Sequence, residues 1–170
     1  MNWIPNEEGI RWFLDEVWPE VHKKYPEIQF HLAGRYMPAW LVDGYQPKIK
    51  VWGEVENAND FVQKHDIAIV PLLSGSGIRI KIIEAMALGK AVITTEVGAE
   101  GILYQNDVNI IIANNKSEFV NAIEKCLSKP GFSNEIGKNA RALIETVYDN
   151  QQIVSRLLLF YEHIRRLLAH

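Results

Sequence analysis

Short apolar runs rich in β-branched residues alternate along this chain with longer segments of helical periodicity. This alternation is typical of βα units that build a parallel sheet. The apolar runs carry little alternating polarity, as expected where helices cover both faces of such a sheet. The predicted strands are residues 29–34, 49–53, 67–71, 91–95 and 110–113. The sequence therefore predicts an α/β fold of three layers, with a parallel sheet in the middle.

Segments of helical period lie before, between and after these runs. In the first of them, Asn6 is the expected N-cap and Pro19 is expected to introduce a kink. The chain has no internal repeat and no linker-like tract, so we expect residues 1–170 to form a single domain closed by C-terminal helices. The predicted helices are residues 7–24, 38–42, 58–64, 78–88, 117–127, 134–148 and 151–168.

Charge and composition argue against several classes of protein. The chain has 18 Lys and Arg against 21 Asp and Glu, a net charge of −3, so we do not expect sequence-independent binding to nucleic acid. No apolar run approaches the roughly 20 residues that span a bilayer, and the first residues lack the pattern of a signal peptide, so we expect a cytoplasmic protein. The five histidines and the single cysteine lack metal-ligand spacing, and we expect no protein-built metal site.

The loop after the third predicted strand is the best candidate for a binding site. It reads Ser74-Gly75-Ser76-Gly77 and leads into a helix expected to begin at Ile78. Ligands of parallel sheets bind at the carboxyl ends of strands, and a helix N-terminus presents free N–H groups to an anion. The glycines allow close approach to the backbone, and the serine hydroxyls can donate to phosphate or sugar oxygens. The spacing matches neither standard glycine-rich motif, so simple helix capping is an equal alternative.

Three charged residues on the helix after this loop add to its chemistry. Glu84 lies among apolar residues, where an unpaired carboxylate is costly to bury, so either ribose hydroxyls or a salt bridge would satisfy it. Arg79 and Lys81 are two residues apart and should not share a helix face. We favour Arg79 as the phosphate contact because it lies nearer the helix start. The next loop, residues 94–101, is expected either to contact a sugar or to cap a short helix.

The stretch from Pro71 to Gly101 resembles the nucleotide-sugar-binding C-terminal domain of the group 1 (family 4) glycosyltransferases. The resemblance rests on the Gly-Ser-Gly turn, on Glu84-Ala-Met-Ala-x-Gly-x-Ala-Val-Ile-x-Thr95 and on Gly98-Ala-Glu-Gly101. It implies a Rossmann-like half of a GT-B fold that binds a UDP-, GDP- or other nucleotide sugar without a cofactor. It also implies a first strand ahead of Asn2 and an N-terminal acceptor domain, so this sequence resembles a fragment of a longer enzyme.

The resemblance assigns roles to particular residues. Glu84 matches the second acid of a Glu-x7-Glu motif, which would hold the donor ribose hydroxyls. The first acid would fall at position 76, where this chain has Ser76. The loop of residues 2–8 lacks the Arg and Lys with which the family commonly holds the diphosphate.

Because residues 2–8 contain no Arg or Lys, other groups are expected to bind the diphosphate. The candidates are Arg79, Lys81 and the helix N-terminus at Gly77–Ile78, with Gly75 and Ser76 beside them. The resemblance places the base against the loop from Gly53 to Val55.

The expected function is transfer of a sugar from a nucleotide diphosphate sugar to an acceptor hydroxyl with retained anomeric configuration. Bacterial cell-surface polysaccharide or glycolipid synthesis is what the resemblance implies. A sugar-nucleotide epimerase of the same fold and a degenerate interaction module are the alternatives. Alone, the chain is expected to bind nucleotide and catalyse little. Its C-terminal apolar stripe is expected to pack on this domain and on the acceptor domain, with peripheral membrane contact as the alternative.

Overall fold

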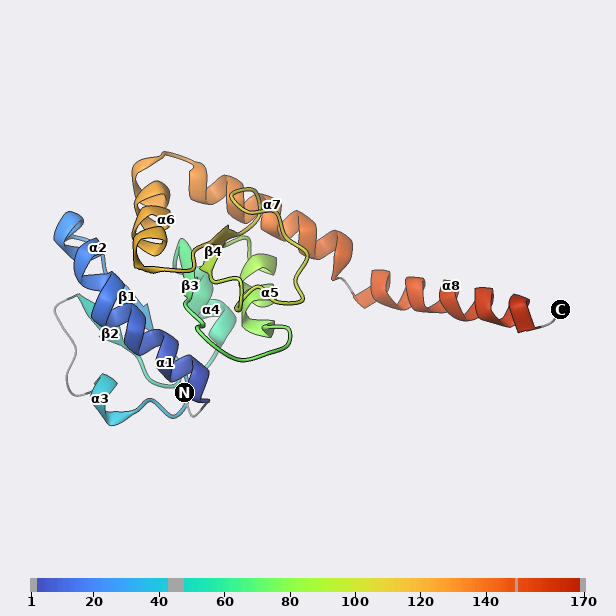
Figure 1. The fold of residues 1–170 in the computed structure, drawn as a ribbon, viewed down its shortest axis with the longest axis horizontal. Coiled ribbons are helices and arrows are strands. Elements are labelled where there is room, and N and C mark those ends of the chain that lie inside the picture. The colour runs from blue at the N-terminus through green and yellow to red at the C-terminus, as the bar shows by residue number, and fades with distance from the viewer. Residues whose placement is uncertain (1–2, 43–47, 149, 169–170) are drawn as a thin grey trace.

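The computed structural model describes residues 3–42, 48–148 and 150–168 of the chain. Within them, short strands alternate with helices, and each strand pair is parallel (Figure 1). The strands are β1 (Phe30–Leu32), β2 (Ile49–Val51), β3 (Ile67–Val70), β4 (Ala91–Thr94) and β5 (Ile111–Ile112). Each strand lies inside a range predicted from sequence and ends one or two residues before the end of that range. The predicted α/β fold is confirmed.

The strands form two sheets rather than one. β1 pairs with β2, and β3, β4 and β5 form the second sheet in that order. In the described part of the chain, β1 and β3 are not hydrogen-bonded to each other. Residues 28–34 and 66–72 instead line the two sides of an open cleft of about 950 Å³. The expected middle layer is therefore present in two parts that face each other across this cleft.

The helices agree with the predicted segments to within a few residues. They are α1 (Ile4–Trp12), α2 (Trp18–Lys24), α3 (Ala39–Val42), α4 (Ala58–Gln63), α5 (Ile80–Ala87), α6 (Lys116–Ser128), α7 (Phe132–Val147) and α8 (Asn150–Leu168). A π-helical segment, η1 (Phe13–Val17), joins α1 to α2.

The first helix begins earlier than predicted. It starts at Ile4, so the prediction that Asn6 is the N-cap is wrong. Pro5 stands in its first turn, where the missing N–H of a proline costs no hydrogen bond. Pro19 lies just after the π-helical segment. A proline ring clashes with the carbonyl four residues before it, and the wider π turn relieves that clash.

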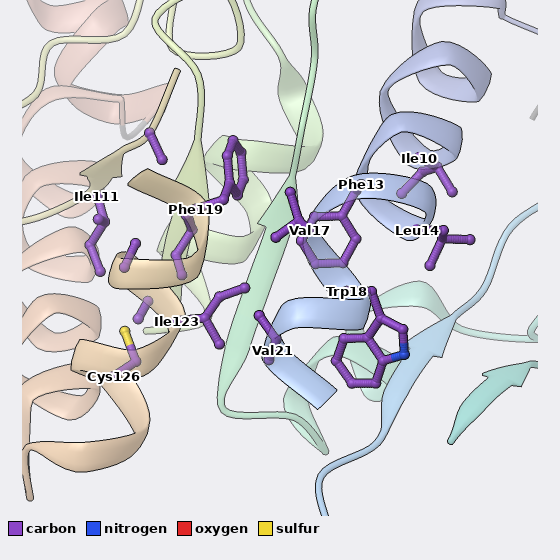
Figure 2. Packing of buried hydrophobic residues seen from close by; sticks show 14 of the residues in the cluster. Ile10, Phe13, Leu14, Val17, Trp18, Val21, Ile111, Phe119, Ile123 and Cys126 are labelled. Carbon is purple, nitrogen blue, oxygen red and sulfur yellow. The ribbon is translucent and has the colours of Figure 1, made fainter. Parts of the chain in front are cut away.

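The larger core cluster packs η1 and α2 against α6 and the sheet. In Figure 2, Phe13, Val17 and Val21 lie on the side of η1 and α2 that faces α6, whereas Leu14 and Trp18 lie on the opposite side. The ring centroid of Phe13 lies 4.9 Å from that of Phe30 on β1 and 6.1 Å from that of Phe119 on α6. Cys126 lies buried in the same cluster, and burial raises the pKa of its thiol to about 11. This core holds η1 and α2 against α6 and against residues of β1, β4 and β5.

The last helix does not pack on this domain as expected. Figure 1 shows α8 extending away from the sheet and the other helices. The side chains of Leu157, Leu159 and Phe160 are about half exposed or more. α7 instead covers α5 and β4, and these apolar side chains of α8 stay exposed in the described structure.

Two glycines hold helices directly against backbone. A Cβ on Gly9 of α1 would lie 2.0 Å from the carbonyl oxygen of Pro71, just after β3. A Cβ on Gly137 of α7 would lie 2.0 Å from the carbonyl oxygen of Gly89, just after α5. Both contacts are far shorter than any real Cβ contact, so only glycine fits. Gly9 therefore sets the start of α1 beside the loop that follows β3.

We predict that Gly9→Ala lowers the free energy of unfolding by about 1–3 kcal/mol, because α1 must move off the Pro71 carbonyl. The measurement is urea unfolding followed by circular dichroism. Lys23→Ala, at an exposed position of α2, is the control and should change stability by less than about 0.5 kcal/mol. Equal stability of the two variants would contradict the proposed packing of α1 on β3.

Candidate functional site

The loop of residues 71–79 joins β3 to α5 at the carboxyl end of β3. Gly75 and Gly77 have φ values of +106° and +86°, which favour glycine. Arg79 is extended, with φ −92° and ψ 95°, and it forms the N-cap of α5. The helix therefore begins at Ile80, and the prediction of a helix N-terminus at Gly77–Ile78 is wrong by two residues. The extended residue turns the Arg79 side chain back toward the loop.

Arg79 is a charged residue that is buried in this loop. Only 7% of it is exposed, and its Nη1 donates a hydrogen bond to the carbonyl oxygen of Ser76. Its Nε and Nη2 are buried and have no hydrogen-bond partner among the described residues. Burying a cation with unpaired donors is costly. An anion that reached this guanidinium would therefore find two unpaired donors.

Trp3 and Gly75 enclose the guanidinium on two sides. The Cζ atom of Arg79 lies 5.0 Å from the centroid of the Trp3 ring, within range of a cation–π interaction. A Cβ on Gly75 would lie 2.8 Å from Nη2 of Arg79 and 3.0 Å from the Trp3 ring. Gly75 is thus required both for its backbone angle and for space. The resemblance placed residues 2–8 near the diphosphate, but the sequence did not indicate that Trp3 contacts Arg79.

Like Arg79, Lys81 contacts the N-terminal end of α1. Its Nζ donates a hydrogen bond to Oδ1 of Asn6 at 2.5 Å. The prediction that Arg79 and Lys81 point to different sides is wrong, because Arg79 precedes the helix and helical spacing does not apply to it. Although Lys81 as a whole is exposed, desolvation and the nearby charge of Arg79 lower the pKa of its ammonium to about 8.

The loop after β4 also contacts the loop of residues 71–79. The backbone N–H of Gly77 donates to Oε2 of Glu100 at 3.0 Å. The Thr95 hydroxyl donates to the carbonyl oxygen of Leu72 and accepts from the N–H of Gly98 at 2.9 Å. On the α1 side, the Ser74 hydroxyl donates to Oε2 of Glu8 at 3.3 Å. Residues of α1 and of the loops after β3 and β4 therefore converge at one place.

Glu84 lies on α5 about one turn after its start. It is exposed, so the argument that burial forces a partner on its carboxylate is wrong. Its neighbours Ala85 and Met86 are buried, because they form the face of α5 that packs on the second core cluster. Ile78 and Ser76 are also exposed. The side chains of Glu84, Ile78 and Ser76 are therefore accessible to a ligand.

The loop predicted to contact the base lies at the carboxyl end of β2. Gly53 has a φ of +67°, and its carbonyl oxygen accepts a hydrogen bond from the N–H of Gly34 at 2.7 Å. Val55 lines the cleft between the two sheets, and Lys81 lines it as well. The structure therefore brings one residue of the predicted base loop to the same cleft as one predicted phosphate contact.

The described residues contain neither a metal-binding cluster nor a membrane-spanning helix. In those residues, no group of three or more His, Cys, Asp and Glu side chains could hold a metal ion. No described helix is long and apolar enough to cross a membrane.

Residues 1–129 match the family model described as Glycosyl transferases group 1. The chain belongs to this family. A protein of Klebsiella pneumoniae, described as an uncharacterized 44.6 kDa protein in the cps region, is 26% identical over 164 residues. The match covers 91% of this chain and 42% of that protein, so the chain spans less than half of this relative.

Solved structures of glycosyltransferases share the fold. The C-terminal domain of the group 1 protein LpcC from Francisella tularensis has a TM-score of 0.70 and 22% identity, over 84% of this chain and 80% of that one. A glycosyltransferase of Rickettsia africae has a TM-score of 0.72 and 19% identity, over 90% and 44%. HepE of Anabaena, solved in complex with UDP, has a TM-score of 0.66 and 21% identity, over 78% and 41%. The fold is thus the Rossmann-like half of GT-B enzymes.

We predict that Lys81 makes stability rise with pH. Its pKa is about 8 in the folded chain and ordinarily 10.5, so between these values the unfolded chain binds more protons and alkali favours folding. The melting temperature of Lys81→Met should lack this rise. The buried Cys126 thiol acts in the opposite direction near pH 9 to 11, but equally in both proteins, so the difference between them isolates Lys81. Parallel melting curves from pH 7.5 to 9.5 would contradict the lowered pKa.

Proposed function

We propose that this chain binds the diphosphate of a nucleotide sugar between the loop after β3 and the start of α1. The observation that carries the proposal is the buried guanidinium of Arg79, whose Nε and Nη2 have no partner among the described residues. A planar fork of donors suits two phosphate oxygens. Membership of the group 1 glycosyltransferases supplies the class of ligand.

In this proposal two cations act together on the leaving group. Arg79 donates to the phosphate oxygens, and Lys81 adds a second positive charge from the first turn of α5. The free N–H groups at the start of α5 stabilise the same anion. Charge that develops on the departing diphosphate is thereby stabilised by groups already in position. Gly75, Gly77 and Ile78 let the donor approach the backbone.

The remaining parts of the donor are assigned to neighbouring residues. Glu84 is proposed to accept hydrogen bonds from the ribose hydroxyls, because its carboxylate is exposed on the same helix. The loop from Gly53 to Val55 is proposed to lie against the base. This loop and the loop after β3 follow the carboxyl ends of the strands β2 and β3, which supports a donor that extends between them.

We further propose that the chain is the donor half of a longer transferase that retains the anomeric configuration and acts in the cytoplasm. An acceptor hydroxyl would come from an N-terminal domain. The chain spans 42% of its Klebsiella relative, whose cps-region description supports a role in polysaccharide synthesis. The UDP bound to Anabaena HepE supports a nucleotide diphosphate sugar as the donor.

The cleft between β1 and β3 supports the same view of a longer protein. Both strands offer an unpaired edge to the cleft in the described structure, and apolar residues such as Phe13 and Ile69 line it. We propose that an extended segment of the full-length protein pairs with both strands there. Amide hydrogen exchange of β1 and β3 should then be slower in the full-length protein than in this chain. β4, already paired on both sides, is the internal control and should change little.

Nucleotide binding is the direct test of the proposed donor site. The full-length protein and this chain are titrated by calorimetry with UDP, GDP, ADP and dTDP. We expect one nucleotide to bind, and Arg79→Gln to weaken it by about 10- to 100-fold, because a charge-assisted hydrogen bond is lost. Glu84→Ala should weaken the same nucleotide through the ribose. Lys138→Gln removes an exposed charge on α7 and should have no effect.

The outcomes separate the alternatives. Unchanged affinity in Arg79→Gln would contradict the assignment of the diphosphate. A full-length protein that binds none of the nucleotides would favour the interaction module. An epimerised donor in place of a glycosylated acceptor would favour the epimerase.

A further inference from the structure

Glu100 lies in the candidate site although it comes from a different loop. Its Oε2 accepts a hydrogen bond from the N–H of Gly77 at 3.0 Å. The residue is exposed, and its Oε1 makes no hydrogen bond with the described residues. One carboxylate oxygen is therefore anchored at the loop after β3, and the other is free to accept hydrogen bonds from a ligand.

The backbone around Glu100 is firmly held. Ala99 is 1% exposed, and a Cβ on Gly101 would lie 2.8 Å from Cγ1 of Ile78, so this loop packs directly on the loop after β3. The hydroxyl of Tyr148, at the end of α7, accepts a hydrogen bond from the N–H of Leu103 at 2.7 Å. The backbone that carries Glu100 is therefore anchored to the loop after β3 and to the end of α7.

The loop after β3 has two cations, Arg79 and Lys81, and the Glu8 carboxylate on its α1 side, and the Glu100 carboxylate on its β4 side. Arg79 and Lys81 contact the start of α1 through Trp3 and Asn6. Glu100 approaches from the loop after β4. A carboxylate repels phosphate, but it accepts hydrogen bonds from hydroxyl groups. The side near Arg79 therefore suits the anionic part of a ligand, and the side near Glu100 suits a neutral, hydroxyl-bearing part.

A nucleotide sugar has these two parts in sequence, a diphosphate followed by a polyhydroxylated ring. On the basis of the proposed function, we infer that Glu100 accepts hydrogen bonds from hydroxyl groups of the donor sugar while Arg79 and Lys81 hold the diphosphate. Ser76, beside Gly77, carries a hydroxyl, and the carboxylate that contacts Gly77 comes from the loop after β4. Glu100 is thus a specificity-determining residue for a sugar with free hydroxyls at this position.

Comparison of each nucleotide with its own sugar ester tests this inference. UDP, GDP, ADP and dTDP are each paired with their glucose derivative, and affinities are measured by calorimetry on the full-length protein. We expect Glu100→Gln to weaken the glucose derivative of the bound nucleotide about 10-fold or more, because hydrogen bonds to a charged acceptor are lost. Affinity for the nucleoside diphosphate alone should stay within about twofold. Glu96→Gln, also exposed and on the same loop, is the matched control and should change neither affinity.

A second comparison uses sugars that lack one hydroxyl. The 3-deoxy and 4-deoxyglucose derivatives should bind the unsubstituted protein less tightly than the glucose derivative, at one position at least. In Glu100→Gln that difference should largely disappear, because a site built for a hydroxyl penalises its absence only while the acceptor is present. Glu100→Asp, which keeps a carboxylate, should retain part of the difference. Melting temperatures verify that each variant is folded.

Three results would overturn the inference, and they are distinguishable. Equal weakening of nucleotide and nucleotide sugar by Glu100→Gln would mean that Glu100 only holds the loop. Tighter binding of the nucleotide alone would mean that the carboxylate competes with phosphate for the N–H of Gly77. If no nucleotide and no nucleotide sugar binds the unsubstituted full-length protein, the proposed function fails and this inference fails with it.

Discussion

The contact between the start of α1 and the end of β3 is the constraint on which the site depends. Gly9 lies directly on the carbonyl oxygen of Pro71, and no larger residue fits there. This contact brings the first residues of α1 over the loop that follows β3, where Trp3 covers the guanidinium of Arg79 and Asn6 accepts a hydrogen bond from Lys81. The large core beneath, centred on Phe13, holds the helix in that position. A close helix–strand contact thus determines where two cations lie.

Charged side chains of both signs lie around the loop after β3, but they do not form ion pairs with one another in the described structure. Arg79 is buried with two unpaired donors, and Lys81 is desolvated enough that its pKa falls to about 8. The two carboxylates that touch the loop, Glu8 and Glu100, bind the Ser74 hydroxyl and the Gly77 N–H rather than the guanidinium. Cations and acids therefore remain available to a ligand that carries both an anionic group and hydroxyls. This is a physical reason to assign the two kinds of contact to different parts of one donor.

Sequence patterns located the elements well and the side chains less well. The alternation of apolar runs and helical periods placed each described strand, because a parallel sheet buried on both faces requires continuous apolar runs. The same patterns misplaced Asn6, the start of α5 and the burial of Glu84. Each error has a local cause. Pro5 in the first turn favours a helix that begins before Asn6, and the extended Arg79 delays the start of α5. Glu84 lies on the exposed side of α5, although Ala85 and Met86 beside it are buried. Glycine-rich spacing placed the loop between β3 and α5 but did not specify its geometry.

The sequence by itself determined the α/β architecture, the position of the Gly-Ser-Gly loop at the end of a strand, and the resemblance that family membership now supports. These follow from periodicity and spacing along the chain, which neighbouring residues suffice to define. Only the tertiary structure brought Trp3 onto Arg79 and Glu100 onto Gly77, and only it divided the sheet into two parts separated by a cleft. These contacts join residues far apart in the chain, and their geometry depends on how helices pack against strands, which no local pattern encodes.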